Sequence, residues 1–206
     1  MLKIWGRPNS INMQKAMWCI GELGLAHEVI PAGGAFGRNN EPWFLAMNPN
    51  GLIPVIDDEG FVLWESNAIV RYLAAKHDPG GLCPEPLTAR ADADRWMEWQ
   101  STSIQPLMTP IFWGLVRTPV EQRNTAAIES AAEKLGKTFA ILDKRLDGRR
   151  FILGERLTMA DIALGAAAYR WYGLTVAHPP HYHLRAWYQR LTERKAFRHH
   201  VMVPLT

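Results

Sequence analysis

The chain has 206 residues, of which 48% are apolar, and a formal net charge of +3 with the histidines neutral. This is enough for a sizeable core, in one large domain or two small ones. The charges are too few and too evenly mixed to indicate a nucleic acid partner. No apolar run approaches the roughly 18 residues of a membrane helix, and the N-terminus lacks the pattern of a signal peptide. A cytoplasmic protein is therefore expected.

The cysteine and histidine spacings argue against metal or disulfide chemistry. Cys19 and Cys83 lie in different segments without C-x-x-C spacing, which excludes a metal knuckle, a dithiol redox motif and a disulfide framework. Four histidines occur in a proline-rich loop and a basic tail without a supporting carboxylate pattern. We expect them to be solvated and predict no metal site: His181, His183, His199 and His200.

The first 78 residues predict a mixed unit of strands and helices. Alternating and β-rich runs indicate strands, whereas apolar residues at helical spacing indicate helices. The expected elements are a strand at 2–5, a turn at 6–10, a helix at 11–23, strands at 27–32, 53–56 and 61–64, and a helix from Ser66. The last two strands flank the turn sequence DDEG and read as a hairpin. The order is βαβ followed by ββα.

The rest of the chain predicts helices only. Residues 79–88 are rich in proline and glycine, so we place a linker there, between a first domain at 1–78 and a second at 89–206. Helical patterns cover about 89–117, 126–146, a segment from about 159, and 184–194. The expected architecture is an α+β domain followed by an all-α domain.

Pro54 stands inside the apolar run of NPNGLIPVID, where a strand would lose a hydrogen bond. An X-Pro bond needs only about 0.5 to 1 kcal/mol to become cis. If the Ile53–Pro54 bond is cis, the N–H and carbonyl of Ile53 point out of the sheet, where an extended peptide can pair with them. The alternative is an edge-strand proline without a ligand, which this stretch alone favours.

The stretch LWESNAIVRYL offers groups for both charges of an amino acid. Ser66 is a good helix N-cap, and the free amides beside it attract a carboxylate. Glu65 attracts an ammonium group. The alternative is a plain cap preceded by an acid that the helix dipole favours.

In GRPNSINMQK, Ser10 stands at the start of the first helix, where the dipole favours an anion such as a thiolate. The Ser10 hydroxyl can donate to a bound sulfur and lower the pKa of the thiol, and the amide of Asn12 can donate a second bond. The alternative for Ser10 is a simple N-cap. Lys15 is expected to be solvated.

Together these residues resemble the cytosolic glutathione transferases over essentially the whole chain. NPNGLIPVI followed by LWESNAIVRYL is similar to the glutathione-site signature of that family, and GERLTMADIAL is similar to its buried capping box, through Thr158 and Asp161. The resemblance implies a thioredoxin-like N-terminal domain, a helical C-terminal domain and a homodimer. It favours the serine-type theta, delta and nu-like classes, because Ser10 stands in the catalytic place and no cysteine or tyrosine does.

The resemblance also implies roles for individual residues. Ser10 and Asn12 resemble the catalytic pair. Ile53, before Pro54, resembles the backbone partner of the cysteinyl unit, and Glu65 with Ser66 the grip on the γ-glutamyl group. Asn50 stands where many relatives hold the glycyl carboxylate with a glutamine, histidine or lysine, so Arg38 is a substitute candidate. Four residues near the domain junction are candidates for the pocket of an apolar electrophile: Met108, Phe112, Trp113 and Tyr169.

The expected reaction is attack by the thiolate of bound glutathione on an electrophilic second substrate, with glutathione as cosubstrate and no metal. Two alternatives stay open. One is a glutathione-dependent disulfide reductase or peroxidase of the nu-like kind, and the other is a binding module that keeps the fold without the chemistry.

Overall fold

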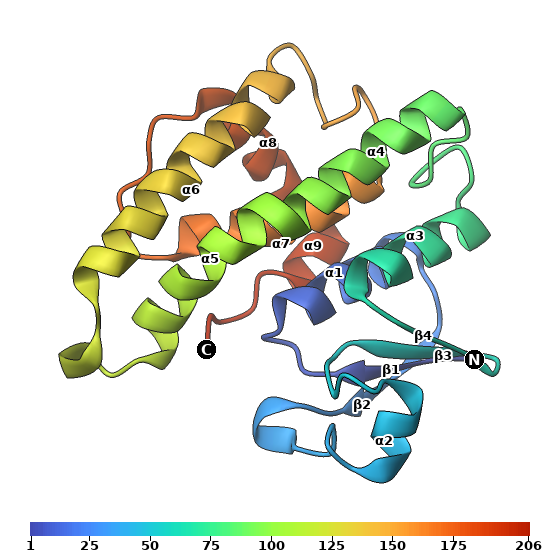
Figure 1. Ribbon diagram of the computed structural model, residues 1–206. Coiled ribbons are helices and arrows are strands. Elements are labelled where there is room, and N and C mark those ends of the chain that lie inside the picture. Colours follow the sequence, from blue (N-terminus) through green and yellow to red (C-terminus); the bar gives the residue numbers. More distant parts are fainter.

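The computed structural model describes residues 1–206 and has a four-stranded sheet next to a larger group of helices (Figure 1). The sheet order is β2-β1-β3-β4. Its strands are β1 (Leu2–Gly6), β2 (His27–Pro31), β3 (Val55–Asp58) and β4 (Phe61–Trp64). β1 is parallel to β2 and antiparallel to β3, and β3 and β4 form the expected antiparallel hairpin. The predicted thioredoxin-like arrangement is confirmed.

Three helices accompany the sheet: α1 (Ile11–Leu23), α2 (Pro42–Met47) and α3 (Ser66–His77). α1 ends where Gly24 takes the left-handed conformation, with φ of 64°. α1 and α3 lie between the sheet and the C-terminal helices, whereas α2 lies on the other side of the sheet (Figure 1). The six-residue α2 was not predicted, because its surroundings are rich in glycine and asparagine.

The C-terminal part is entirely helical apart from isolated bridges, as predicted. Its helices are α4 (Leu87–Trp99), α5 (Gln105–Phe112), α6 (Thr125–Leu146), α7 (Met159–Gly173), α8 (Tyr182–Thr192) and α9 (Lys195–His200). The stretch expected to be helical at about 89–117 is helical but not one regular helix, because π-helical turns at Gln100–Ile104 and Trp113–Arg117 interrupt it. Pro106 and Pro110 lack the N–H groups that a regular helix needs. None of the helices is both long and apolar enough to span a bilayer.

One continuous core joins the two parts. Ile4 and Trp18 from the sheet side belong to the same buried cluster as Phe139 and Trp171 from the helices. Thr158 and Asp161 form the expected capping box at the start of α7. The Asp161 carboxylate accepts the N–H of Thr158 at 2.9 Å and that of Ile152 at 3.0 Å, so it ties the preceding loop to the helix. α1 packs against both α3 and α7, which positions its first turn at the junction between the sheet and the C-terminal helices.

Candidate functional site

Ser10 is the N-cap of α1, as predicted. Its backbone is extended, with φ of −83° and ψ of 123°, and its Oγ accepts the N–H of Met13 at 3.5 Å. The hydroxyl proton is donated to no group of the chain. Ser10 therefore presents a free O–H donor at the positive end of a 13-residue helix.

Asn12 and Ser66 bring the first turns of two helices together. The Ser66 hydroxyl donates to Oδ1 of Asn12 at 3.2 Å, although the two residues are 54 positions apart in the chain. The prediction that Ser66 is the N-cap of α3 is wrong. Glu65 holds that position, because its carbonyl accepts the N–H of Ile69 at 2.9 Å, and Ser66 is the first helical residue. The Ser66 hydroxyl is therefore turned toward α1.

Glu65 has a strained backbone, with φ of 70° and ψ of 110°. Positive φ is uncommon outside glycine and costs on the order of 1 to 3 kcal/mol, and residues held this way cluster at binding sites. The Glu65 side chain is exposed and caps nothing. A carboxylate held in this way beside Ser66 is available to a cationic ligand.

The Ile53–Pro54 peptide bond is cis, which meets the condition set for a peptide-binding edge at Ile53. The N–H and carbonyl of Ile53 make no hydrogen bond within the chain. The predicted strand boundary at Ile53 is wrong, since β3 begins only at Val55 and Ile53 lies outside the ladder. Gly33 packs directly on Ile53, because a Cβ there would stand 3.1 Å from Cδ1 of the isoleucine. The unpaired edge next to Pro54 is thus open to an extended peptide.

Arg38 and Asn50 lie on adjoining loops. The Asn39 amide donates to the carbonyl of Gly51 at 2.7 Å and joins the two loops. Asn50 is exposed, and its own amide donates to Oδ1 of Asn48 at 3.0 Å. Arg38 is exposed, with its guanidinium 5.0 Å above the Trp43 ring. The two loops thus meet at Gly51, two residues before Ile53, and Arg38 carries a positive charge on one of them.

Lys15 contradicts the expectation that it is solvated. It is 2% exposed, and its ammonium donates to Asn67 on α3 and to Gln100 beside α4, at 3.0 Å each. Burial lowers the pKa of Lys15 to about 7, and the positive charge of Arg71 acts in the same direction, against Glu65 and Glu98. The reason is packing, because α1 is sandwiched between α3 and the C-terminal helices, so even its polar face is enclosed.

A cavity of about 150 Å³ lies beside Ser10, at the junction with α5 and α7. Phe112 and Trp113, two of the candidates for an electrophile pocket, line it. Met108 and Tyr169 do not. Met108 is wholly buried in the core, and the Tyr169 hydroxyl donates to the carbonyl of Val203 at 2.5 Å.

The same cavity is lined by three arginines that sequence reasoning missed: Arg7, Arg117 and Arg170. Arg170 carried a usable signal. It stands in the otherwise apolar run AAAYRWYG, and a helix that is apolar all round is buried, so its one charge is buried too. The sequence around Arg7 and Arg117 gave no such signal. Arg7 lies in a turn sequence and Arg117 follows an aromatic-rich segment, and neither pattern shows which way the side chain points.

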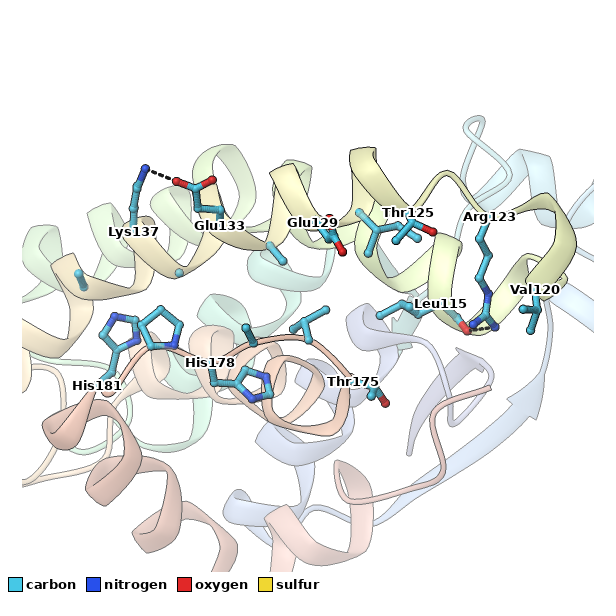
Figure 2. Close-up of a pocket in the computed structure, with 17 residues that line it drawn as sticks. Leu115, Val120, Arg123, Thr125, Glu129, Glu133, Lys137, Thr175, His178 and His181 are labelled. Carbon is cyan, nitrogen blue, oxygen red and sulfur yellow. Dashed lines mark hydrogen bonds and ion pairs between the residues drawn. The ribbon is translucent and has the colours of Figure 1, made fainter.

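The largest cavity, about 950 Å³, lies elsewhere, between α6 and the loop at 175–181 (Figure 2). None of the predicted site residues lines it. The lysine and the arginine on its rim already have partners. Lys137 pairs with Glu133 at 2.5 Å, and Arg123 donates to the carbonyl of Leu115 at 2.6 Å.

The histidines are only partly as expected. His183 and His199 are exposed, but His181 and His200 are partly buried. Burial lowers the pKa of His200 to about 4, assisted by His199 and His27. α9 packs on α1, which encloses a residue predicted to lie in a solvated tail. No three His, Cys, Asp or Glu side chains are grouped to hold a metal ion, and both cysteines are buried and free.

Comparison with known proteins agrees with this geometry. The family model of the glutathione S-transferase N-terminal domain matches residues 1–75, and the family model of the C-terminal domain matches residues 125–190. The chain is 41% identical to glutathione S-transferase GstB of Escherichia coli, with all of both chains covered. The chain belongs to the glutathione S-transferase family. Its sequence is also 33% identical to glutathione S-transferase 3 of Zea mays, covering 95% of this chain and 91% of that one.

A solved structure resembles this transferase closely. The theta class glutathione S-transferase from Xanthomonas axonopodis pv. citri, crystallised with glutathione bound, superposes with a TM-score of 0.96 at 44% identity. The match covers 100% of this chain and 99% of that one. The predicted family and fold are confirmed, and the theta class is among those that the Ser10 motif favoured.

Proposed function

We propose that this transferase binds glutathione along the open edge beside Pro54 and activates its thiol at the first turn of α1. The backbone of Ile53 pairs with the cysteinyl unit. The amides at the start of α3, with Ser66, hold the γ-glutamyl carboxylate, and Glu65 holds the ammonium group. Residues 1–78 form the glutathione-binding domain, and 89–206, after the linker at 79–88, supply the second-substrate pocket.

The observation that carries the proposal is the 3.2 Å hydrogen bond between Ser66 and Asn12. It sets the start of α3, with its unpaired amides, next to the start of α1, with the free hydroxyl of Ser10. A tripeptide paired with Ile53 and held at its γ-glutamyl end by α3 then has its sulfur within reach of Ser10. A scaffold without chemistry needs neither the unpaired Ile53 backbone nor the strained Glu65.

The reaction follows from the ionisation of a thiol. A free thiol has a pKa near 8.5, so only a few per cent is thiolate at neutral pH. Hydrogen bonds from Ser10 and from the free amide N–H of Asn12 stabilise the thiolate, and the N-terminal dipole of α1 adds to them. Each pKa unit removed corresponds to about 1.4 kcal/mol. The thiol proton leaves to solvent, the sulfur attacks a carbon of the second substrate, and a thioether forms as the leaving group departs.

The glycyl carboxylate and the second substrate complete the site. Arg38, on the loop beside Asn50, supplies the positive charge that the carboxylate requires. The electrophile enters the cavity lined by Phe112 and Trp113, where the aromatic rings contact its apolar part. Met108 and Tyr169 are not part of this pocket.

Isothermal titration with glutathione tests the proposal against its alternatives. Binding at micromolar to millimolar concentration, with turnover of a thiol-reactive electrophile, is expected. No binding at millimolar glutathione would instead indicate a binding module of another kind. Turnover of a disulfide or peroxide in place of every electrophile would indicate the reductase or peroxidase.

We also propose that the chain works as a cytoplasmic homodimer. Phe61 and Val62 are exposed on the edge strand β4, and a second subunit can cover such a surface. Two free thiols, Cys19 and Cys83, fit a reducing compartment. Light scattering of the purified protein tests the dimer: a monomer mass at micromolar concentration would contradict it.

A further inference from the structure

A series of hydrogen bonds between polar side chains leads from α3 to the small cavity beside Ser10. The Lys15 amine donates to Oδ1 of Asn67 and to Oε1 of Gln100, at 3.0 Å each. The Gln100 amide in turn donates to Oε1 of Gln105 at 3.2 Å. The first three side chains are buried, and Gln105 lines the cavity together with Ser10. The first turn of α3 is therefore connected to the wall of this cavity.

Lys15 fixes the orientation of the Gln100 amide. Asn67 donates an N–H to the main-chain carbonyl of Met97 at 2.9 Å, and a carbonyl can only accept, so Oδ1 of Asn67 must face Lys15. A lysine ammonium has three donors and no acceptor, so Gln100 must also face it with its oxygen. The neutral amine keeps two N–H groups, one for each oxygen, so both oxygens keep a donor when Lys15 titrates.

The orientation passes from Gln100 to Gln105. Because the oxygen of Gln100 faces Lys15, its N–H faces Gln105, which must accept with its own oxygen. The nitrogen of Gln105 is thereby turned to Thr109 and donates to its Oγ1 at 3.1 Å. An amide nitrogen carries two N–H groups, and the second makes no hydrogen bond within the chain. Thr109 also lines the cavity, so this side of the wall presents a free N–H donor.

The irregular helix between Gln100 and Gln105 makes this contact possible. On a regular α-helix the neighbours of a residue lie three and four positions away, so positions five apart do not face each other. In the π-helical turn at Gln100–Ile104, the N–H of Gln105 donates to the carbonyl of Gln100, and the two side chains meet. Pro106 follows, and it lacks the N–H that a regular helix would use there. Such π-helical turns are frequent at functional sites.

We propose that Gln105 is a catalytic residue that donates its second N–H to an oxygen of the electrophile, and that Lys15 and Gln100 are positioning residues that turn this N–H toward the cavity. The inference rests on the proposed function and names a substrate class of the same site. A small, neutral α,β-unsaturated carbonyl compound suits such a donor, because negative charge develops on its oxygen during attack. Ser10 and Gln105 line one cavity of about 150 Å³, so a small molecule in it reaches both the sulfur and the amide.

The reaction with such a compound is an addition. The glutathione sulfur, whose proton has left to solvent, forms a bond to the terminal carbon of the double bond. The π-electron pair moves toward the carbonyl, and the oxygen of the resulting enolate accepts the N–H of Gln105. A proton from solvent then adds to the carbon next to the carbonyl, and the carbonyl is restored. When the sulfur instead displaces a halide, the negative charge departs with the halide, so Gln105 contributes little.

Acrylamide and allyl bromide form a matched pair for the test. Both are neutral and carry a vinyl group on a third carbon, but acrylamide develops charge on its oxygen, whereas allyl bromide has no oxygen and loses bromide. For each reagent, kcat/KM is divided by the rate constant of its reaction with free glutathione at the same pH. We expect this enhancement to be at least tenfold larger for acrylamide. Cys19 and Cys83 are buried, which protects the chain from alkylation, and intact mass verifies this.

Two variants assign the difference to the amides. Gln105→Met removes the donor at nearly the same side-chain length, so it should lower the enhancement for acrylamide about tenfold or more and change that for allyl bromide less than about twofold. Gln100→Glu still accepts from Lys15, but its second oxygen repels the oxygen of Gln105, so the Gln105 amide turns over and loses its donor to the cavity. We expect the same selective loss. The control Gln189→Glu makes the same change of charge at an exposed position of α8 and should leave both enhancements unchanged.

The role of Lys15 is tested by Lys15→Met. Without the amine, the Gln100 amide is free to turn over, so the enhancement for acrylamide should fall severalfold relative to that for allyl bromide. If this variant does not fold, Gln100→Glu decides, since it keeps Lys15 paired. The ratio of the two enhancements cancels any effect on the glutathione thiol, which both reagents share.

Four outcomes overturn the inference. One is a wild-type ratio of one or less together with clear enhancement for allyl bromide, a result that leaves the proposed transferase function standing. Another is a high ratio that Gln105→Met leaves unchanged, and a third is an equal loss for both reagents, which would indicate a structural effect. A selective loss in Gln105→Met without one in Gln100→Glu overturns the positioning role. If neither reagent shows enhancement, the inference also falls, and calorimetric binding of glutathione then decides whether the proposed function falls with it.

Discussion

Lys15 predicts an unusual dependence of stability on pH. Its pKa is about 7 in the folded chain, against an ordinary value of 10.5. Between these values the unfolded chain binds a proton that the folded chain has released, so the free energy of unfolding rises with pH. Integrating over this interval gives a penalty of about 4 kcal/mol at pH 7 and about 2 kcal/mol at pH 9. The wild type should therefore gain about 2 kcal/mol from this group between pH 7 and pH 9.

Lys15→Met removes the titration and keeps the length of the side chain. It also leaves the oxygens of Asn67 and Gln100 without their donor, which costs about 1 to 3 kcal/mol each at every pH. The informative quantity is therefore the slope with pH and not the offset. The buried tyrosines titrate equally in both proteins and cancel in the difference.

Urea unfolding of the two proteins, at one protein concentration and at pH 6, 7, 8 and 9, measures this difference. We expect the wild type to gain on Lys15→Met by about 2 kcal/mol from pH 7 to pH 9, with little change from pH 6 to pH 7. If the variant does not fold, Lys15→Gln serves, since it also lacks the charge. A difference that stays flat from pH 7 to pH 9 would refute the argument and show that Lys15 stays charged in its network.

Three further substitutions, two of them with a comparison variant, test the assigned stability and binding roles. Glu65→Gly relieves the positive φ, so the free energy of unfolding should rise by about 1 kcal/mol while the dissociation constant of glutathione rises at least tenfold. The control is Glu59→Gly, at φ of 57° in an exposed turn, which should stabilise the chain without weakening glutathione binding. Asp161→Ala removes the acceptor of several buried donors and should lower the free energy of unfolding, measured in urea, by roughly 3 kcal/mol or more. Thr158→Ala should lower it by only about 1 kcal/mol, so equal losses would contradict the assigned hydrogen-bond network. Arg38→Ala should raise the dissociation constant of glutathione severalfold in calorimetry, and an unchanged constant would remove Arg38 from the site.

The open edge could be predicted from the sequence because its signals are local. Pro54 inside an apolar run allowed a cis bond, which the family resemblance then favoured, and Ser10 before a periodic helix indicated an N-cap. Both depend on residues close in the chain. The capping box of Thr158 and Asp161 is local in the same sense, since it joins positions three residues apart.

The errors concern contacts between distant segments. The sequence around Lys15 does not distinguish it from a solvated lysine, because its burial depends on packing against α3 and Gln100. The three arginines lie far apart in the chain, at positions 7, 117 and 170, so their meeting depends on the packing of α5 and α7 beside β1. The interruption of the helical stretch at 89–117 is an exception, because Pro106 and Pro110 are local signals that helical periodicity alone does not take into account.

The role of Ser10 is tested most directly by the pKa of the bound glutathione thiol, measured from the ultraviolet absorbance of the thiolate across pH. Ser10→Ala removes the hydroxyl that faces the sulfur, and Ser10→Thr keeps it. We expect the pKa of the bound thiol to lie well below that of free glutathione in the wild type and in Ser10→Thr. In Ser10→Ala it should rise by about one unit or more, with the pH profile of kcat/KM moving alongside. The same pKa in all three proteins would contradict activation by Ser10.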